Sequence, residues 1–421
     1  MTAAAATTEV ILTPAQVRRA RILGIVELAL AAIVIVVFAI GSEGDGRFTL
    51  SQGGVDAPDL VFPAATVSYI VAILLAFLGA RQVTRGFGDK ANIVLGIALL
   101  LFIVAFLAWA TAQSPTGQFN MTSMLKLTIE RSVPIAFGAL SGVLCERVAV
   151  INIAIEGMLL GGAFMAALVG SATNNVMGIV AGVATGAVLA WVLAVLSIKY
   201  RVDQIIAGVV INIFVLGLTS FLTVRLLAEN PHLNNADVFR SWDIPLLSKI
   251  PVLGPVLFSH TLFVYGLFIL VALTTWALFK TKWGLRSRAV GEHPKAADTL
   301  GVNVYRMRYL NVILGGMIAG FGGAWFTVGL VGRFDENMTN GRGFIGLAAM
   351  IFGRWHPVGA MAAALVFGFA DAIAGKLGIL QTGIPSQFLL MLPAIATIIV
   401  VAGLVGRSRP PAADGQPYIK E

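Results

Sequence analysis

Six polar or acidic side chains lie within stretches of sequence that are otherwise apolar, and their types could support chemistry. They are Asn152, Glu156, Gln204, Asn212, Thr219 and Asp371. An ionised side chain at the centre of a lipid bilayer costs on the order of 2.5 to 3.5 kcal/mol, so such groups avoid lipid. Amides, hydroxyls and carboxylates there either line a path for a polar solute or hydrogen-bond neighbouring helices. The sequence leaves both roles open.

Spacing places several of these residues on common helix faces. Asn152 and Glu156 are four residues apart in a helix expected over 148–169, so they would lie one turn apart on the same face. A second polar stripe is expected on a helix over 204–226. That stripe runs along Gln204, Gly208, Asn212 and Thr219. Each stripe could face a solute path or a neighbouring helix.

Glycines spaced four apart mark two edges where helices could pack closely. Gly157 and Gly161 form one such edge, about a quarter-turn from Glu156. Gly316 and Gly320 form another. Small residues at this spacing let helix backbones approach each other, so tight packing is the favoured interpretation.

The segment 343–375 predicts a hairpin rather than a simple span. Its first apolar piece has 11 residues, which is too short to cross a hydrocarbon core of ~30 Å at ~1.5 Å per residue. A polar tip with Arg354 and His356 separates it from a longer apolar piece that contains Asp371. We expect a re-entrant or broken hairpin, or two short crossings. The acids within the apolar stretches could pair with Arg131 and Arg354, or contact a substrate.

Residues 280–308 form a charged island between two long apolar stretches. The segment reads KTKWGLRSRAVGEHPKAADTLGVNVYRMR and holds seven Lys or Arg residues and two acids. Only 12% of the whole chain is charged. A basic loop of this kind usually faces the cytoplasm, where it could contact a soluble partner.

Composition establishes the class of protein that must position these residues. A mean hydropathy of +0.89 over 421 residues leaves too little polar surface for a water-soluble globule. We therefore expect an all-α, polytopic transmembrane bundle of about ten spans plus the hairpin. The expected spans are 22–40, 63–80, 91–110, 125–145, 148–169, 176–197, 204–226, 261–279, 307–330 and 385–406.

Positive charge predicts the orientation of these spans. With the N-terminus inside, most of the 29 Lys and Arg residues fall in cytoplasmic segments. Both termini are then cytoplasmic, in a multi-pass membrane protein. The basic residues are scattered over several short loops, which argues against nucleic-acid binding.

Common catalytic and metal-binding patterns are missing from the sequence. It has no phosphate-binding loop, zinc-binding helix or nucleophile elbow, so we expect no catalytic residues. Its single cysteine and four dispersed histidines give no metal-site pattern, and we expect no metal or cofactor on this chain. If ATP drives a process here, the ATPase must be another polypeptide.

Three blocks of sequence carry a resemblance to a known family. They are ERVAVINIAIEGMLLGGAF (146–164), GLRSRAVGEHPKAADTLGVNVYRMRYLNVILGGMIAGFGGA (284–324) and GRGFIGLAAMIFGRWHPVGAMAAALVFGFADA (341–372). In order and spacing they resemble ABC importer permeases of the ribose and branched-chain amino acid type. Within that family they are most similar to the nucleoside and simple-sugar uptake permeases. The likeness covers about 125–406.

The resemblance implies a type II importer, in which two permeases form the path and two cytoplasmic ATPases bind ATP and magnesium. A related but different second permease is implied more strongly than a homodimer. An extracellular or periplasmic binding protein would deliver a nucleoside or simple sugar. The alternative is an ion- or proton-coupled secondary transporter that uses Glu156 or Asp371, which would leave the charged island unexplained.

The resemblance also assigns a role to the charged island, as the loop that couples the permease to the ATPase. A short contact helix is expected from about Pro294 to Leu300, with proline early in the helix. The expected contact residues are Arg288, Gly291, Glu292, His293, Pro294, Lys295, Ala296, Ala297 and Asp298. Arg306 and Arg308 are expected to anchor lipid headgroups.

The chain divides into four expected parts. They are a cytoplasmic tail (1–21), an N-terminal elaboration of three spans (22–120), the permease core (121–406) with its coupling loop (280–308), and a cytoplasmic tail (407–421). Within the core, the outer loop 227–260 is expected to cap the vestibule and help dock the binding protein, or to be a mere linker. A short helix over 236–247 is expected in it.

Overall fold

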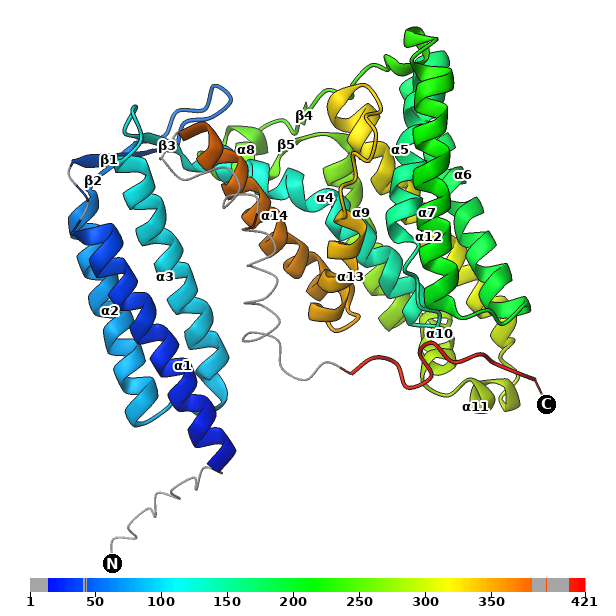
Figure 1. Cartoon of the computed structure of the whole chain (residues 1–421), viewed down its shortest axis with the longest axis horizontal. Coiled ribbons are helices and arrows are strands. Elements are labelled where there is room, and N and C mark those ends of the chain that lie inside the picture. Colours follow the sequence, from blue (N-terminus) through cyan, green and yellow to red (C-terminus); the bar gives the residue numbers. More distant parts are fainter. Residues whose placement is uncertain (1–13, 41, 43, 381–390, 392–408, 421) are drawn as a thin grey trace, which may run out of the picture.

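Long apolar segments form helices throughout the computed structural model, which describes residues 14–40, 42, 44–380, 391 and 409–420. In hydrocarbon every backbone amide and carbonyl needs a partner within the protein, and a helix supplies these partners locally. Figure 1 shows two groups of helices side by side. The prediction of an all-α, polytopic bundle is confirmed.

The smaller group is N-terminal and consists of three long helices under a small sheet. Its helices are α1 (Pro14–Ile33), extended by the π-helical η1 (Val34–Ala39), α2 (Ala64–Thr84), the short η2 (Gly88–Lys90) and α3 (Ala91–Ala112). Its strands are β1 (Asp45–Thr49), β2 (Leu60–Pro63) and β3 (Gln118–Asn120). Strand β1 is central, antiparallel to β2 and parallel to β3.

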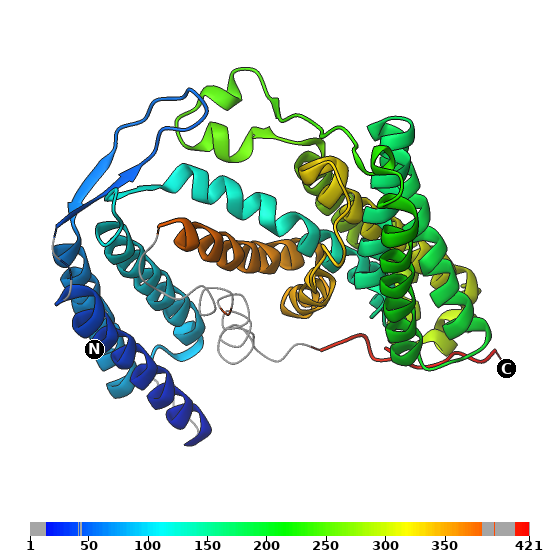
Figure 2. The same ribbon diagram turned by 45° about the horizontal axis from the view of Figure 1, so that its top comes forward.

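The larger group contains the remaining elements. They are α4 (Met121–Glu146), α5 (Ile155–Ala172), α6 (Asn175–Ala194) with η3 (Val195–Lys199), α7 (Gln204–Leu222) with η4 (Thr223–Leu227), η5 (Pro231–Asn234), β4 (Trp242–Asp243), η6 (Leu247–Lys249), α8 (Leu253–Leu257), β5 (Ser259–His260), α9 (Leu262–Lys280), α10 (Lys282–Glu292), α11 (Pro294–Thr299), α12 (Val304–Phe326) with η7 (Thr327–Val331), α13 (Arg342–Phe352) and α14 (Pro357–Leu380). Helices α4 and α12 are mostly buried inside it. Figure 2 shows α14 running beside α4.

Ten helices in the described ranges are long and apolar enough to cross a membrane. They are Val17–Ala39, Ala64–Thr84, Gly88–Ala112, Met121–Glu146, Ile155–Ala172, Asn175–Lys199, Gln204–Leu227, Leu262–Lys280, Val304–Val331 and Pro357–Gly378. The nine expected spans from 22–40 to 307–330 each coincide with one of them. The expected span 385–406 lies outside the described residues.

The hairpin at 343–375 has two unequal arms. Helix α13 has 11 residues, or roughly 16 Å at the rise of an α-helix, so it cannot cross by itself. Helix α14 has 24 residues and contains a span-length segment. The hairpin therefore has one short arm and one span-length arm. The arms meet at the end of the molecule where α10 and α11 lie (Figure 1).

Glycines let α12 and α6 pack with their backbones almost in contact. A Cβ atom on Gly320 would lie 2.2 Å from the carbonyl oxygen of Gly182, and one on Gly316 would lie 2.4 Å from that of Gly186. These gaps are too small for any side chain. The close approach of two helices there requires glycine at these positions.

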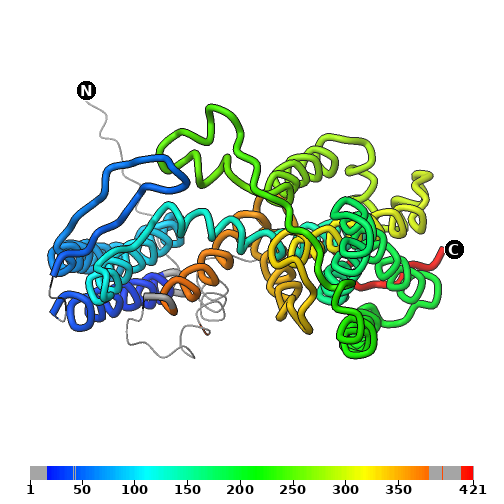
Figure 3. Tube along the Cα trace, turned by 90° about the horizontal axis from the view of Figure 1, so that it is seen from above, coloured from blue at the N-terminus to red at the C-terminus, as the bar shows by residue number. Residues whose placement is uncertain are grey.

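The segment 228–260, which follows η4, contains little helix. The expected helix over 236–247 is wrong, because backbone amides in this part bond to the end of α12 instead. The amide of Ala236 donates to Gly332 and that of Phe239 to Val328, and β4 then pairs with β5. Figure 3 shows this segment beside the loop that joins β1 and β2.

Candidate functional site at the break before α5

The chain is not helical between α4 and α5, and four of the six predicted pathway residues, Asn152, Glu156, Gln204 and Asn212, lie around this break. The connector, residues 147–154, contains Ala149 in the left-handed region with φ of 61°. Helix α5 begins only at Ile155. The expected helix over 148–169, with Asn152 and Glu156 on one face, is therefore wrong at its start, and Asn152 precedes the helix.

Two amide side chains from α7 replace the backbone partners that the connector lacks. Gln204 accepts a hydrogen bond from the amide of Ile151 at 2.6 Å. Asn212 donates to the carbonyl of Ile153 at 2.8 Å and accepts from the amide of Gly157 at 2.7 Å. A buried backbone group without a partner costs about 1–3 kcal/mol, which explains why these amides face the connector.

Asn152 is completely buried against the end of α4. Its Nδ2 lies 3.5 Å from both the hydroxyl of Ser141 and the sulfur of Cys145, and 3.6 Å from the sulfur of Met158. Thr219 donates its hydroxyl to the carbonyl of Val215 within its own helix. Both side chains are enclosed in this conformation, and their role in a solute path stays a prediction.

Glu156, in the first turn of α5, holds the start of α13. Its carboxylate accepts hydrogen bonds from the hydroxyl of Thr339 (2.6 Å) and from the amides of Gly341 (2.8 Å) and Gly343 (2.6 Å). The N-terminus of a helix carries partial positive charge and unpaired amides, so an anion there is stabilising. Glu156 thus caps a second helix from outside.

Gly343 is required for this contact. A Cβ atom at this position would lie 2.7 Å from the backbone of Glu156 and from its carboxylate. The backbone of α13 therefore lies directly against the first turn of α5. The close approach lets the carboxylate reach two amides at once.

Asp371 pairs with a residue that the sequence analysis missed. Its Oδ2 lies 3.2 Å from the guanidinium of Arg342 at the start of α13, and 3.8 Å from that of Arg131 on α4. Arg342 and Asp371 lie at similar distances on either side of the hairpin tip, so antiparallel arms bring them together. This spacing could have identified the pair. Arg354 instead lies exposed at the tip.

The hairpin tip docks onto the start of the connector. The indole of Trp355 donates to the carboxylate of Glu146, and the guanidinium of Arg147 donates to the carbonyl of Trp355 at 2.9 Å. The ring of His356 stacks on Phe279 at the end of α9, with 4.6 Å between centroids. Burial, and next the charge of Arg147, lowers the pKa of His356, which favours the neutral ring.

Cations crowd the junction between the tip and α10. The guanidinium groups of Arg147 and Arg288 both lie over the ring of Phe279, at 5.5 and 5.0 Å from its centroid. Burial lowers the pKa of Arg147, and the charge of Arg288 lowers it further. Arg288 of the charged island and His356 of the hairpin tip thus both pack on the ring of Phe279.

The charged island folds into two helices, α10 and α11. His293 accepts a hydrogen bond from the amide of Ala296 through Nδ1 at 3.2 Å, and Pro294 is the first residue of α11. The predicted short helix is confirmed with bounds Pro294–Thr299. Ala297 faces inward, whereas Lys295 and Ala296 are exposed. Gly291 contacts the connector, because a Cβ there would lie 2.4 Å from the carbonyl of Arg147.

The expectation that Arg308 anchors lipid headgroups is wrong. Its side chain is 1% exposed and donates to the carbonyl of Gln416 in the C-terminal tail at 3.1 Å. No local pattern in the sequence predicts that the tail returns to Arg308. Arg306, two residues earlier, is exposed.

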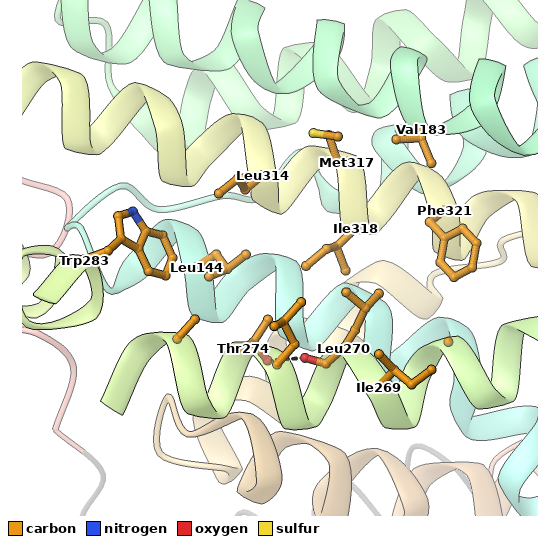
Figure 4. Close-up of a pocket in the computed structure, with 13 residues that line it drawn as sticks. Leu144, Val183, Ile269, Leu270, Thr274, Trp283, Leu314, Met317, Ile318 and Phe321 are labelled. Atoms are coloured by element: carbon orange, nitrogen blue, oxygen red, sulfur yellow. Dashed lines mark hydrogen bonds between the residues drawn. The ribbon is translucent and has the colours of Figure 1, made fainter. Parts of the chain in front are cut away.

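An apolar pocket of about 560 Å³ lies among α4, α6, α9, α10 and α12 (Figure 4). Its lining includes Leu144, Ile318 and Phe321, and Thr274 donates its hydroxyl to Leu270 within α9. None of the predicted pathway residues lines it. Because a hydroxylated solute needs polar partners, this pocket does not suit one. Across the described ranges, no three His, Cys, Asp or Glu side chains gather as metal ligands.

Comparison with known proteins finds a match to one family model. Residues 123–402 match the model of the family described as branched-chain amino acid transport system / permease component. No solved structure matches the chain.

Several curated proteins are also similar to this chain. The guanosine ABC transporter permease protein NupQ of Bacillus subtilis is 39% identical over 71% of this chain and 97% of its own length. The nucleoside ABC transporter permease protein NupC of Lactococcus lactis is 40% identical over 72% of this chain and 99% of its own. A more distant relative, the guanosine ABC transporter permease protein NupP of Bacillus subtilis, is 24% identical over 74% of this chain and 91% of its own.

Proposed function

This chain belongs to the family of branched-chain amino acid transport system permease components, and on that premise we propose that it forms half of the membrane path of an ABC importer for nucleosides. One observation carries the proposal. Two nucleoside permeases are 39% and 40% identical to this chain over almost their whole lengths. The chain itself is a multi-pass membrane protein.

The ATPase that drives this importer is a separate polypeptide, which binds the ATP and magnesium and docks on α11. Exposed residues on the outer face of this helix support the docking. Ala296 leaves room for a partner to approach, Lys295 can meet an acidic group, and Leu300 is 84% exposed beside them. A short helix with a small-residue face and a charged rim suits a groove in a soluble domain.

A second, related permease completes the path, and a binding protein delivers the substrate at the opposite end. Two different permeases of Bacillus subtilis are similar to this chain, at 39% and 24% identity. That difference supports a heterodimer. The end that carries β1–β5 faces outward in this proposal, and both termini face the cytoplasm with α10 and α11.

Transport proceeds by alternating access, in which ATP binding moves α10 and α11 and the membrane helices exchange outward and inward openings. This chain breaks no covalent bond. Its contacts make α5, α7 and α13 move together, because Glu156 joins α5 to α13 and Asn212 joins α5 to α7.

Both carboxylates that could serve a proton-coupled transporter already have partners. Glu156 holds three hydrogen-bond donors, and Asp371 pairs with Arg342. A proton carrier needs a carboxylate that can exchange its proton with water. The described contacts therefore favour the ATP-driven importer.

Reconstituted uptake tests the proposal. The chain, its ATPase, its second permease and its binding protein are placed in liposomes, and uptake of radiolabelled guanosine is measured with ribose and glucose as competitors. We expect uptake that needs ATP and that the sugars do not reduce. Uptake driven by a pH gradient without ATP would contradict the importer, and competition by ribose would shift the substrate to simple sugars.

A further inference from the structure

The C-terminal tail, residues 409–420, lies across the base of the larger helix group. Figure 1 shows it as the red trace beside α10 and α11. It has no helix or strand of its own. Pro411, Ala413 and Tyr418 are nevertheless buried. A terminal segment usually remains ordered only where contacts hold it.

The tail is attached first to α10 and α11. The amide of Ala412 donates to the carboxylate of Glu292 at 3.2 Å, and the amide of Ala413 donates to the carbonyl of Gly291 at 3.0 Å. Farther along, the ammonium of Lys420 lies 3.6 Å from the carboxylate of Asp298. These contacts bind the tail to the end of α10 and to α11.

The start of α12 holds the tail from the other side. The buried guanidinium of Arg308 donates to the carbonyl of Gln416 at 3.1 Å. The rings of Tyr305 and Tyr418 pack with 5.4 Å between centroids, and Tyr418 is 6% exposed. Removing the tail would leave the Arg308 guanidinium in an apolar place without this acceptor, which is costly for a charged group.

The same tail also touches the connector before α5. A Cβ on Gly415, whose φ is +73°, would lie 2.9 Å from the side chain of Ile151. The carboxyl of Asp414 interacts with that of Glu146 at the end of α4. The tail therefore contacts both the ATPase-docking element and the segment that precedes Glu156.

From the connector, a continuous set of contacts reaches the membrane interior. The amide of Ile151 donates to Gln204 on α7, and Asn212 on α7 binds both Ile153 and Gly157. Glu156, the residue before Gly157, accepts hydrogen bonds from two amides at the start of α13. The connector thus contacts α7 directly and reaches α13 through the first turn of α5.

We propose that the C-terminal tail is a transmission strap, which joins α10 and α11 to the connector so that movement of the docking element reaches Glu156 and α13. The inference rests on the proposed function, because it presumes an ATPase that moves α11. Tyr418 and Arg308 act as positioning residues. Neither touches substrate or ATP in this arrangement.

A strap differs from a structural support in what its loss does. Without a support, the importer fails to assemble or loses stability. Without a strap, the ATPase still docks on α11 and hydrolyses ATP, but the membrane helices no longer follow. The readout that separates the two is the ratio of solute transported to ATP hydrolysed.

The experiment uses the complete importer in liposomes, with radiolabelled guanosine as the transported probe. Tyr418→Ala removes the ring that packs on Tyr305, and deletion of 409–421 removes the strap. Tyr69→Ala on α2, where the tyrosine is 45% exposed, is the matched control. We expect both tail variants to bind the ATPase and hydrolyse ATP, while transport per ATP falls roughly tenfold, the scale of a coupling energy between two sites. The control should match the natural chain.

Hydrogen exchange on the same complexes shows how far the conformational change extends from α11 toward the connector. ATP and vanadate should change amide exchange in both α11 and the connector of the natural chain. In Tyr418→Ala we expect the change in α11 to remain and that in the connector to disappear. Unchanged transport per ATP in Tyr418→Ala would overturn the strap, even if the deletion variant fails to fold.

Two further outcomes separate the strap from the proposed function. Tail variants that lose the ATPase altogether would make the tail part of the docking surface and overturn the strap. If the natural chain shows no ATP-dependent uptake of any probe and binds no ATPase, the proposed function itself fails.

Discussion

At the residue scale, the side-chain amide of Asn212 makes two hydrogen bonds that an apolar side chain cannot make. It satisfies the carbonyl of Ile153 and the amide of Gly157 on either side of the start of α5. We expect Asn212→Leu, which keeps the size but removes both hydrogen bonds, to destabilise the importer by about 1–3 kcal/mol for each backbone group left unpaired. Thermal unfolding of the purified complex measures the loss.

Ile213→Leu is the matched control for Asn212→Leu. Ile213 follows on the same helix and is 66% exposed, so its replacement should leave stability unchanged. Equal melting temperatures for the two variants would show that the amide of Asn212 does not support the connector.

Gly343 supports a second prediction at this scale, because its backbone lies against Glu156. The Cβ of Gly343→Ala would lie 2.7 Å from the backbone of Glu156, so α13 must move away and the carboxylate loses its donors. Overpacking of this kind costs about 1–3 kcal/mol. We expect a lower melting temperature and reduced guanosine uptake. Gly375→Ala on α14, where the Cβ would meet nothing within 4 Å, should behave like the natural chain.

Asp414 makes docking of the tail depend on pH. Burial raises the pKa of its carboxyl to about 6, although Arg308 opposes the shift; the carboxylate of Glu146 and the amide of Gly415 also face it. Because the docked tail binds the proton more tightly than the released tail, docking is strongest at low pH. It weakens as pH rises from about 4 through about 6.

A spin label on the tail can follow this equilibrium. The label is placed by Ile419→Cys in a chain whose Cys145 is replaced, and its mobility is measured from pH 4 to 8. We expect the equilibrium constant for docking of the tail to fall roughly tenfold over this range. This is less than the full pKa shift of Asp414 implies, because its side chain is partly exposed. Asp414→Asn should remove the change between about pH 4 and 6, whereas Asp298→Asn should keep it. Identical profiles of label mobility against pH for Asp414→Asn and the natural chain would show that Asp414 does not cause the pH dependence.

The sequence predicted which residues are polar inside the membrane but not which groups they meet. Glu156 and Asp371 were both expected to avoid lipid, and both have partners in the protein. Their partners are the amides of α13 and the guanidinium of Arg342, which come from distant parts of the chain. A hydropathy pattern contains no information on such contacts, because it describes each helix separately.

At the element scale, local signals predicted α11 well and the start of α5 poorly. Pro294 and the preceding histidine begin a helix through backbone geometry and side-chain capping, which depend only on neighbouring residues. The break at 147–154 depends instead on Gln204 and Asn212 from α7. An apolar run with no proline gave no reason to end the helix there.

The exposed face of α11 is where an element-scale change should uncouple transport. Lys295→Glu combined with Ala296→Trp reverses one charge and fills the space beside it, while Ala297 keeps α11 attached to the molecule. We expect guanosine uptake and substrate-stimulated ATP hydrolysis to be lost, with normal insertion into the membrane. Arg306→Glu, an exposed charge reversal at the start of α12, is the control. Normal uptake in the double variant would exclude α11 as the docking element.

At the scale of the whole molecule, the N-terminal helices precede the family match, which begins at residue 123. Two relatives align over 97% and 99% of their own lengths while covering only 71% and 72% of this chain. The extra helices are nevertheless packed onto the core. Phe48, Leu107 and Phe119 share an apolar cluster with Met124 on α4 and Ile373 on α14.

Because the family-matched core contains α10 and α11, the connector and the hairpin, we expect deletion of residues 1–113 to leave ATP-dependent guanosine uptake measurable. The deletion exposes the apolar faces of Met124 and Ile373, which are 0% and 7% exposed in the full chain. Burial of an apolar side chain contributes about 1.5–3 kcal/mol, so the melting temperature of the complex should fall. Replacing both residues with serine in the shortened chain should reduce its aggregation in detergent. Complete loss of ATPase binding after the deletion would instead place the N-terminal helices within the working core of the importer.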